Sequence, residues 1–245
     1  MYTTMYCEGK ALSFYVLSTL FTILYFIITA PVLLFIPVSL RIVLATKWCK
    51  GILFLCKVLD GITYEVVGKD NMPSQPYIVA SEHQSPLETI ILFVEFPNVS
   101  YVLKQEVRFI PFIGLYLNLL KMVFIDRNQK VAALRKMVRE CDACSKNGRT
   151  ILIFPEGTRV RYGENGSKDY HVGIAMVYQK LQVPVVPVVM NTGKYWPAGI
   201  VSFKKKRGTV TIKILSPIEP DLGKEEFMET LKNRMIEGGR QLRNE

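Results

Sequence analysis

The sequence predicts an α/β domain with a largely parallel central sheet flanked by helices, preceded by an N-terminal membrane-associated helical segment. From Gly61 onward, short apolar runs rich in β-branched residues alternate with segments of helical periodicity, as in strands joined by crossover helices. Before Gly61, a long uncharged apolar run is followed by a basic amphipathic run. The 245 residues suffice for one sizeable domain and an appendage, which we place at 61–245 and 1–60.

The apolar run from Ala11 to Leu40 contains no charged residue. Because about twenty helical residues cover the ~30 Å hydrocarbon core of a bilayer, residues 11–30 can cross or insert deeply before Pro31 and Pro37 disturb the helix. A cleaved signal peptide is the alternative. Its apolar core is usually about 7–15 residues long and ends near a small-residue cleavage site. This run is longer and has no good site, so the sequence favours a retained membrane anchor.

Residues 41–60 have the pattern of an amphipathic helix. At about 100° per residue, one face carries Leu44, Trp48, Ile52, Leu55 and Leu59, and another carries Lys47, Lys50 and Lys57. This pattern is typical of a helix in the membrane interface with its lysines towards anionic headgroups. An ordinary core-packing helix is the alternative, and the position directly after an anchor favours the interface.

The net charge of +10 indicates acidic partners, either nucleic acid or anionic lipid. The sequence has no RNA-binding signature and no helix-turn-helix pattern, and the anchor favours lipid. We therefore expect an anionic phospholipid membrane as partner and no nucleic acid. Almost all of the charge lies after residue 40, which places residues 41–245 at the cytoplasmic face of the inner or cell membrane.

The cysteines provide no disulfide framework, because their number is odd. They are Cys7, Cys49, Cys56, Cys141 and Cys144. The spacing of Cys141 and Cys144 allows a redox or zinc site. However, both fall in a helical pattern that runs to Gly148, with no second such pair and no histidine nearby. We interpret them as structural and expect no metal.

The α/β part reads as an ordered series of strands and helices. The predicted strands are 62–68, 76–80, 121–125, 150–154 and 183–190, with a hairpin over 199–215. The predicted helices begin at Pro86 and cover 130–147, 171–182 and 223–242. If the strands are parallel, their carboxyl ends share one edge of the sheet, where ligand sites of α/β proteins form.

His83, one of two histidines, lies in the turn after the strand 76–80. Ser85 suits the N-cap of the following helix, Pro86 its first position and Glu88 the third, which together make a capping box. Glu88 therefore has a structural explanation. A carboxylate there can also reach the imidazole, fix its tautomer and stabilise the imidazolium. The spacing predicts a catalytic pair and leaves the structural alternative open.

The stretch "FPEGTR" places a polar turn directly after the strand 150–154. Gly157 lets the backbone approach a ligand closely, and Thr158 and Arg159 offer a hydroxyl and a guanidinium that suit a phosphate. The stretch "FIDR" puts Arg127 just past another strand. A plain turn with a surface arginine is the alternative reading.

Together, "HQSPLE", "KMVFIDR", "FPEGTR" and "VPVVPV" resemble, in this order, the motifs of glycerolipid acyltransferases of the lysophosphatidate acyltransferase type. The resemblance covers roughly residues 61–220. It implies transfer of an acyl chain from acyl-ACP or acyl-CoA to the sn-2 hydroxyl of lysophosphatidate, which forms phosphatidate without a cofactor or metal. It also implies that His83 is the base and Glu88 its acidic partner. The phosphate-binding stretches then contain Arg127, Glu156, Gly157, Thr158 and Arg159.

The chain departs from the family pattern at several positions. Glu88 stands where aspartate is usual, and Glu82 where asparagine is common. A basic residue often precedes the glycine of a later helix. Here His171 holds that place with Lys168 nearby, and both are candidates for a phosphate contact.

Several alternative functions stay open. Another lysophospholipid or glycerol 3-phosphate is an alternative acceptor. A membrane esterase that uses Ser85 or Ser81 lacks the G-x-S-x-G elbow. A lipid-binding scaffold would explain the anchor and the charge but not the polar motifs at strand ends.

Overall fold

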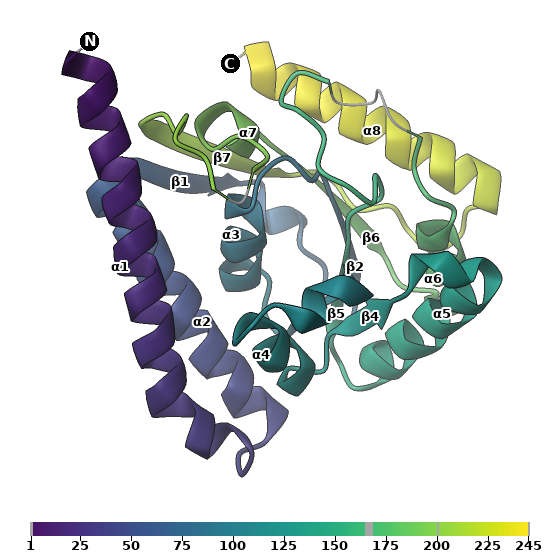
Figure 1. Cartoon of the computed structure of the whole chain (residues 1–245). Helices are drawn as coiled ribbons and strands as arrows, with labels where there is room; N and C mark the ends of the chain where they lie inside the picture. The colour runs from purple at the N-terminus through teal and green to yellow at the C-terminus, as the bar shows by residue number, and fades with distance from the viewer. Residues whose placement is uncertain (1, 165–168, 200, 245) are drawn as a thin grey trace.

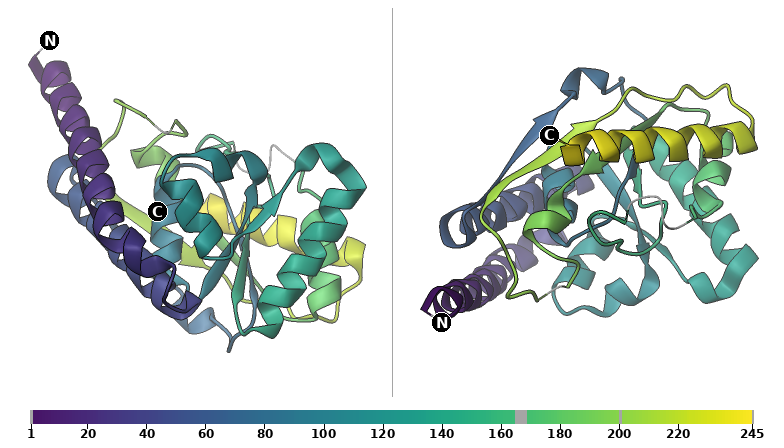
Figure 2. Two further views of the ribbon diagram at one scale, coloured as in Figure 1. Left: turned by 60° about the horizontal axis from the view of Figure 1, so that its bottom comes forward. Right: turned by 90° about the horizontal axis from the view of Figure 1, so that it is seen from above.

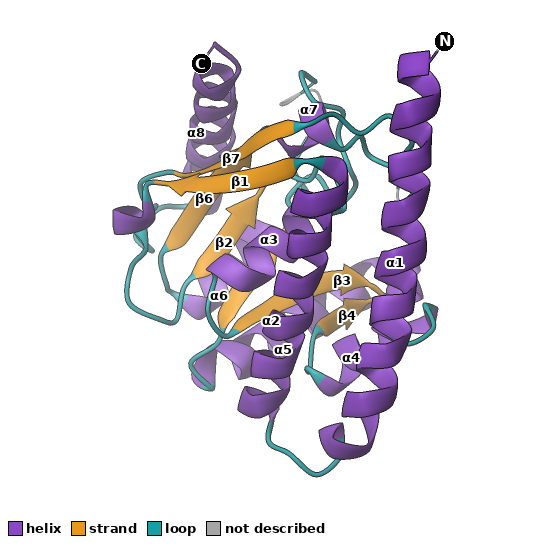
Figure 3. Ribbon diagram, turned by 90° about the vertical axis from the view of Figure 1, so that its left-hand side faces the viewer, coloured by secondary structure: helices purple, strands orange, loops and turns teal. Residues whose placement is uncertain are grey.

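The structure, a computed structural model, describes residues 2–164, 169–199 and 201–244. It confirms the α/β class, with a seven-stranded, mostly parallel sheet that has helices on both faces (Figures 1 and 2). A pair of N-terminal helices, α1 (Tyr2–Leu33) and α2 (Val38–Leu55), lies along one side of this layered domain (Figure 3). A π-helical turn, η1 (Cys56–Asp60), leads from α2 into the first strand.

The sheet has the strand order β1-β7-β6-β2-β5-β3-β4. Its strands are β1 (Ile62–Val67), β2 (Ile78–Ser81), β3 (Val99–Lys104), β4 (Val123–Ile125), β5 (Thr150–Ile153), β6 (Val185–Met190) and β7 (Gly208–Ile214). Neighbouring strands are parallel except β6 and β7, which pair antiparallel. The carboxyl ends of β2, β5, β3 and β4 therefore meet at one edge, as the sequence analysis assumed.

Two apolar cores lie on opposite faces of the sheet, because successive side chains of a strand point to opposite sides. Ile78 and Ala80 of β2 pack with α5, α6 and α8, whereas Val79 packs on the side of α2 and α3. The helices of the domain are α3 (Leu87–Glu95), α4 (Ile113–Leu119), α5 (Lys130–Lys146), α6 (Gly173–Leu181), α7 (Thr192–Tyr195) and α8 (Lys224–Asn244). Short helices η2 (Lys69–Asn71), η3 (Gln105–Phe109) and η4 (Arg127–Gln129) complete it.

The N-terminal helices are packed against the domain rather than separate from it. Leu12–Leu33 of α1 is long and apolar enough to cross a membrane, and Phe14, Thr29 and Leu33 within it are buried. α1 continues through Pro31 and ends two residues later, so the proline lies in the last turn and interrupts few helical hydrogen bonds. Cys49 and Ile52 of α2 are buried in the core while Lys47 and Lys50 are exposed. α2 thus combines a packing face with the basic face that the sequence predicts.

Two parts of the sequence-based assignment are wrong. The strand β3 and the helix α4 were not predicted, and they fill residues 99–119 together with η3. The hairpin predicted over 199–215 is not formed: among its described residues, 201–207 are a loop and Gly208–Ile214 are the single strand β7. The loop does not pair because it docks on α1: Tyr15 Oη accepts from the Ser202 amide at 2.6 Å and donates to the Ser202 carbonyl at 3.1 Å.

The cysteine pair lies on α5, as expected, and both thiols are free. Cys141 is fully buried in the core, and this burial raises the pKa of its thiol. Within the described residues, no group of three or more His, Cys, Asp or Glu side chains is placed to hold a metal ion.

Candidate active site

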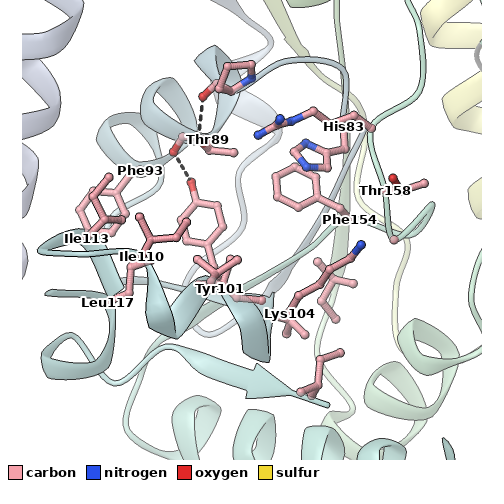
Figure 4. Close-up of a pocket in the computed structure, with 18 of the residues that line it drawn as sticks. His83, Thr89, Phe93, Tyr101, Lys104, Ile110, Ile113, Leu117, Phe154 and Thr158 are labelled. Carbon is pink, nitrogen blue, oxygen red and sulfur yellow. Dashed lines mark hydrogen bonds between the residues drawn. The ribbon is translucent and has the colours of Figure 1, made fainter. Parts of the chain in front are cut away.

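The motifs at the strand ends converge on one cavity of about 1000 Å³ (Figure 4). His83 follows β2, Arg127 follows β4, and the loop 155–159 follows β5. A hydrogen bond of 2.7 Å from the Val160 amide to the His83 carbonyl ties the loop to the histidine turn. His83, Arg127, Gly157, Thr158, Arg159 and His171 all line the cavity.

His83 and Glu88 are in direct contact. Nδ1 of His83 lies 2.8 Å from Oε1 of Glu88, whose side chain is fully buried. A carboxylate only accepts hydrogen bonds, so the pair selects the tautomer of His83 that carries its proton on Nδ1. Nε2 is then the ring nitrogen left for a ligand in the cavity. Phe154 supports the imidazole from one side, with ring centroids 4.1 Å apart and planes inclined by 21°.

Glu88 also closes the start of α3. Its Oε1 accepts from the backbone amides of Gln84 at 2.9 Å and Ser85 at 2.8 Å. α3 begins at Leu87, one residue later than predicted, and the Leu87 amide donates to Ser85 Oγ. The carboxylate that caps the helix is therefore the one that orients the imidazole, and the two sequence-based explanations of Glu88 do not compete.

The second oxygen of Glu88 is held as well. Oε2 accepts from the hydroxyl of Thr192 at 2.8 Å, and Thr192 is fully buried. With His83, Gln84 and Ser85, this makes four hydrogen bonds to one buried carboxylate. Such bonds offset the cost of removing a charge from water. Glu88 is thereby fixed in position on both oxygens.

Gly157 brings the loop after β5 close to the ring of His171 and the guanidinium of Arg127. Its φ is +66°, in the left-handed region that favours glycine. A Cβ there would come within 2.6 Å of the His171 ring and 2.8 Å of Arg127 Nη1. Arg127 donates from Nη1 to the Gly157 carbonyl. Glycine is therefore required at this position both by conformation and by space.

Arg159 reaches into the cavity from the same loop. Its Nη1 donates to the carbonyl of Ala198 at 2.8 Å, and its Nε is buried without a partner. Partial burial lowers the pKa of both Arg159 and Arg127 from the ordinary value. Neither guanidinium has an ion-pair partner within the described part of the chain.

The cavity has a cationic end and no acidic group. Besides the two arginines, Lys104 and Lys130 line it, whereas none of its described lining residues is Asp or Glu. Lys104 was not predicted from the sequence, because this residue ends β3 and that strand was not predicted. Figure 4 shows Lys104 extending toward Phe154 and His83. A cavity lined by basic side chains and by no described carboxylate favours an anionic ligand.

The other end of the cavity is apolar. Phe93, Tyr101, Ile110, Ile113 and Leu117 line it (Figure 4). The N-terminal helices supply a wall from Thr22, Tyr25, Phe26, Ala45, Trp48 and Cys49. The N-terminal segment, which the sequence analysis treated as an anchor, is thus also part of the cavity.

One predicted site residue, Glu156, is not brought to the cavity. Glu156 is 7% exposed and does not line it. Because the side chain is buried away from the cavity, the structure argues against a phosphate contact by the Glu156 side chain. Burial raises the pKa of Glu156 to about 8. Lys168 lies outside the described residues.

Comparison with known proteins identifies the class. A family model described as Acyltransferase matches residues 63–191, more than half of the chain. The chain therefore belongs to the acyltransferase family, as the sequence motifs predicted.

Individual relatives agree with this assignment. A 1-acyl-sn-glycerol-3-phosphate acyltransferase of Pseudomonas aeruginosa is 39% identical over 168 residues, which cover 69% of this chain and 64% of that protein. A Saccharomyces cerevisiae protein of the same name is 30% identical over 189 residues, which cover 74% of this chain and 61% of that protein. The matched part thus spans less than two thirds of either relative.

A solved structure supports the fold. The crystal structure of the 1-acyl-sn-glycerophosphate (LPA) acyltransferase from Thermotoga maritima matches with a TM-score of 0.75 at 24% identity. The match covers 96% of this chain and 95% of that one, so the likeness includes the N-terminal helices as well as the sheet.

The buried carboxyl of Glu156 makes the stability of the protein depend on pH. Its folded-state pKa of about 8 lies above the ordinary 4.5, so the folded state binds the proton more tightly and loses stability as pH rises through this window. Glu156→Gln mimics the protonated form. We expect the melting temperature of this variant, relative to that of the parent, to rise as the pH increases from 5 to 9. A difference that is constant over this range would contradict the assignment.

Proposed function

We propose that this acyltransferase moves an acyl chain from acyl-ACP or acyl-CoA to the sn-2 hydroxyl of lysophosphatidate. The observation that carries the proposal is that His83, held by the buried Glu88, lines one cavity that is cationic at one end and apolar at the other. Lysophosphatidate has the matching chemistry, with a phosphate, a free hydroxyl and an acyl chain in series. The names of the relatives from Pseudomonas and yeast support the same acceptor.

In the proposed reaction, His83 acts as general base. Nε2 removes the proton of the acceptor hydroxyl, and the Glu88 carboxylate stabilises the imidazolium that forms. The oxygen attacks the thioester carbonyl, and the tetrahedral intermediate collapses with cleavage of the C–S bond. The thiol leaves with the proton that His83 had taken, so the pair returns to its starting state.

In this scheme the cationic side chains bind the acceptor phosphate and polarise the thioester carbonyl. Arg159 and Arg127 hold the acceptor phosphate and position the hydroxyl, and His171 lies beside them against Gly157. In this proposal Lys104, which lines the cavity, stabilises the negative charge that develops on the carbonyl oxygen.

The surroundings of the nearby nucleophiles favour direct transfer over an acyl-enzyme. Ser81 and Ser85 are fully buried and do not line the cavity, which argues against the esterase alternative. Cys49 lines the cavity, but burial raises the pKa of its thiol to about 12, so little of the reactive thiolate forms near neutral pH.

We further propose that the protein works at the cytoplasmic face of the membrane, inserted rather than spanning. The domain contacts α1 near both ends of its apolar run, through Tyr15 with Ser202 and Thr29 with Tyr116. The apolar run is therefore partly occupied by protein along its length. Large apolar side chains stay exposed on α1, on the connection to α2 and around α4: Leu24, Ile27, Ile28, Leu34, Phe35, Phe109 and Leu115.

The acceptor and donor can be tested directly. Membranes containing the protein, given labelled acyl-ACP or acyl-CoA and a panel of lysophospholipids and glycerol 3-phosphate, should form mainly phosphatidate from lysophosphatidate. Donor hydrolysis without transfer would support an esterase, and no reaction would support a scaffold.

The His83–Glu88 pair can be tested by substitution. Glu88→Gln keeps an oxygen for the backbone amides at the helix start but removes the charge, so kcat should fall about a hundredfold or more while stability changes little. Glu88→Asp keeps the charge on a shorter arm and should be impaired less. His83→Ala should be folded and nearly inactive. An active His83→Ala protein would refute the mechanism. A normal kcat in Glu88→Gln would mean that Glu88 only caps the helix α3.

Arg159 can be tested through the acceptor. Arg159→Ala should raise the KM for lysophosphatidate more than the KM for the donor. Arg159→Lys should rescue only partly, because a lysine cannot form two parallel hydrogen bonds to a phosphate. If the donor KM rises and the acceptor KM does not, the arginine binds the carrier instead.

Membrane insertion predicts resistance to salt, because salt screens exposed charges but does not release buried apolar groups. The full chain should stay with the membrane at 1 M salt. Replacing Leu24, Ile27 and Ile28 together by serine should weaken attachment, whereas Val67→Ser, a substitution of an exposed apolar residue on β1, should not. Release of the intact protein by salt alone would disprove insertion.

A further inference from the structure

One segment of the chain touches both the catalytic pair and the phosphate-binding arginine. We call residues 192–199 and 201–205 the strap, which leads from the end of β6 across to α1 (Figures 1 and 3). At its start, the Thr192 hydroxyl donates to Glu88 Oε2 at 2.8 Å. Further along, the Ala198 carbonyl accepts from Arg159 Nη1 at 2.8 Å. The strap thus holds Glu88 of the catalytic pair and Arg159 of the phosphate-binding loop.

The far end of the strap is fixed to α1 through a buried cation. Lys205 Nζ lies 2.6 Å from Asp60 Oδ2, and the two side chains are 4% and 3% exposed. The same ammonium group lies 3.4 Å from the ring centroid of Phe14, 3.8 Å from that of Trp196 and 4.4 Å from that of Tyr15. These distances are within the range of cation–π attraction. We call these five residues the lysine cage.

The lysine cage joins separate parts of the chain. Phe14 and Tyr15 belong to α1, Asp60 ends η1, and Trp196 and Lys205 belong to the strap. Burial lowers the pKa of Lys205 and raises that of Asp60, and their ion pair opposes both shifts. A buried pair of this kind tolerates loss of one partner poorly, because the other charge is left uncompensated.

We propose that the strap is a positioning element of the active site and that α1 holds it in place through the lysine cage. The strap acts at two residues, Thr192 and Ala198. Thr192 orients Glu88, and the carbonyl of Ala198 orients Arg159. The N-terminal helix then contributes to the chemistry as well as to attachment. This inference rests on the proposed acyl transfer.

Thr192 offers the sharpest test. Thr192→Val keeps the shape but removes the donor to Glu88 Oε2. We expect kcat to fall about tenfold or more, the scale of one hydrogen bond to a charged group, with the KM for lysophosphatidate unchanged. Thr192→Ser, which restores the hydroxyl, should recover most of the rate. Parent-like kcat in Thr192→Val, even with a lower melting temperature, would reduce Thr192 to a structural residue and overturn its role.

The coupling to α1 is tested with Phe14→Leu, which removes the ring nearest to Lys205. Assays of the full chain in detergent with a short-chain lysophosphatidate, well below the melting temperature, remove any need for membrane attachment. We expect a lower kcat and a higher KM for the acceptor, since both Thr192 and Arg159 lose support. Phe21→Leu is the matched control, because Phe21 on the same helix packs against Gly51 of α2. Equal effects of the two substitutions would overturn the coupling.

A double-substitution cycle shows whether the two sites act together. If the lysine cage works through Thr192, the kcat loss in the Phe14→Leu, Thr192→Val protein should be smaller than the product of the two single losses. If the two kcat losses multiply, the substitutions act independently, and the lysine cage does not act through Thr192 on the Glu88 carboxylate. The parent protein separates this inference from the proposed function: no transfer by the parent refutes the function, whereas an active parent with an unaffected Phe14→Leu variant refutes only the coupling.

Discussion

The buried carboxylate of Glu88 is the point on which the site depends. It lies at the start of α3, closes that helix through two backbone amides and holds His83 through the same oxygen. A charge removed from water is tolerated only where donors surround it, and here the donors come from the turn after β2 and from Thr192 after β6. The sheet brings these two strands side by side. The order of the strands therefore sets the geometry of the proposed base.

The parallel sheet also explains why the cationic groups gather. Arg127 and Arg159 follow different strands, β4 and β5, and line the same cavity because the carboxyl ends of parallel strands share an edge. Gly157 then lets the loop approach Arg127 and His171 closely. The absence of acidic residues among the described lining residues leaves this charge for an anionic ligand. The proposed phosphate binding and the proposed proton transfer thus share one edge of one sheet.

The sequence predicted those parts of the site that are close together in the chain. His83 and Glu88 are five residues apart, so the turn–helix pattern alone indicated that they could meet. Thr192 could not be found this way, since it meets Glu88 only through the pairing of β2 with β6. Lys104 was missed because β3 lacks a clear alternation, and the loop before β7 was taken for a strand because its docking on Tyr15 is a tertiary contact. Glu156 was grouped with the phosphate ligands by its place in a motif, which carries no information about where its side chain points.

The cavity wall formed by Tyr25, Phe26 and Trp48 bears on how such a chain can change in evolution or by design. An unrelated hydrophobic helix grafted in place of the first 60 residues would restore attachment to a bilayer but leave the apolar end of the cavity open along one side. It would also remove Phe14, Tyr15 and Asp60 from around Lys205 and leave Trp196 as its remaining aromatic neighbour in the lysine cage. Anchor and catalytic domain are therefore not interchangeable modules, and changes in one must be matched by changes in the other.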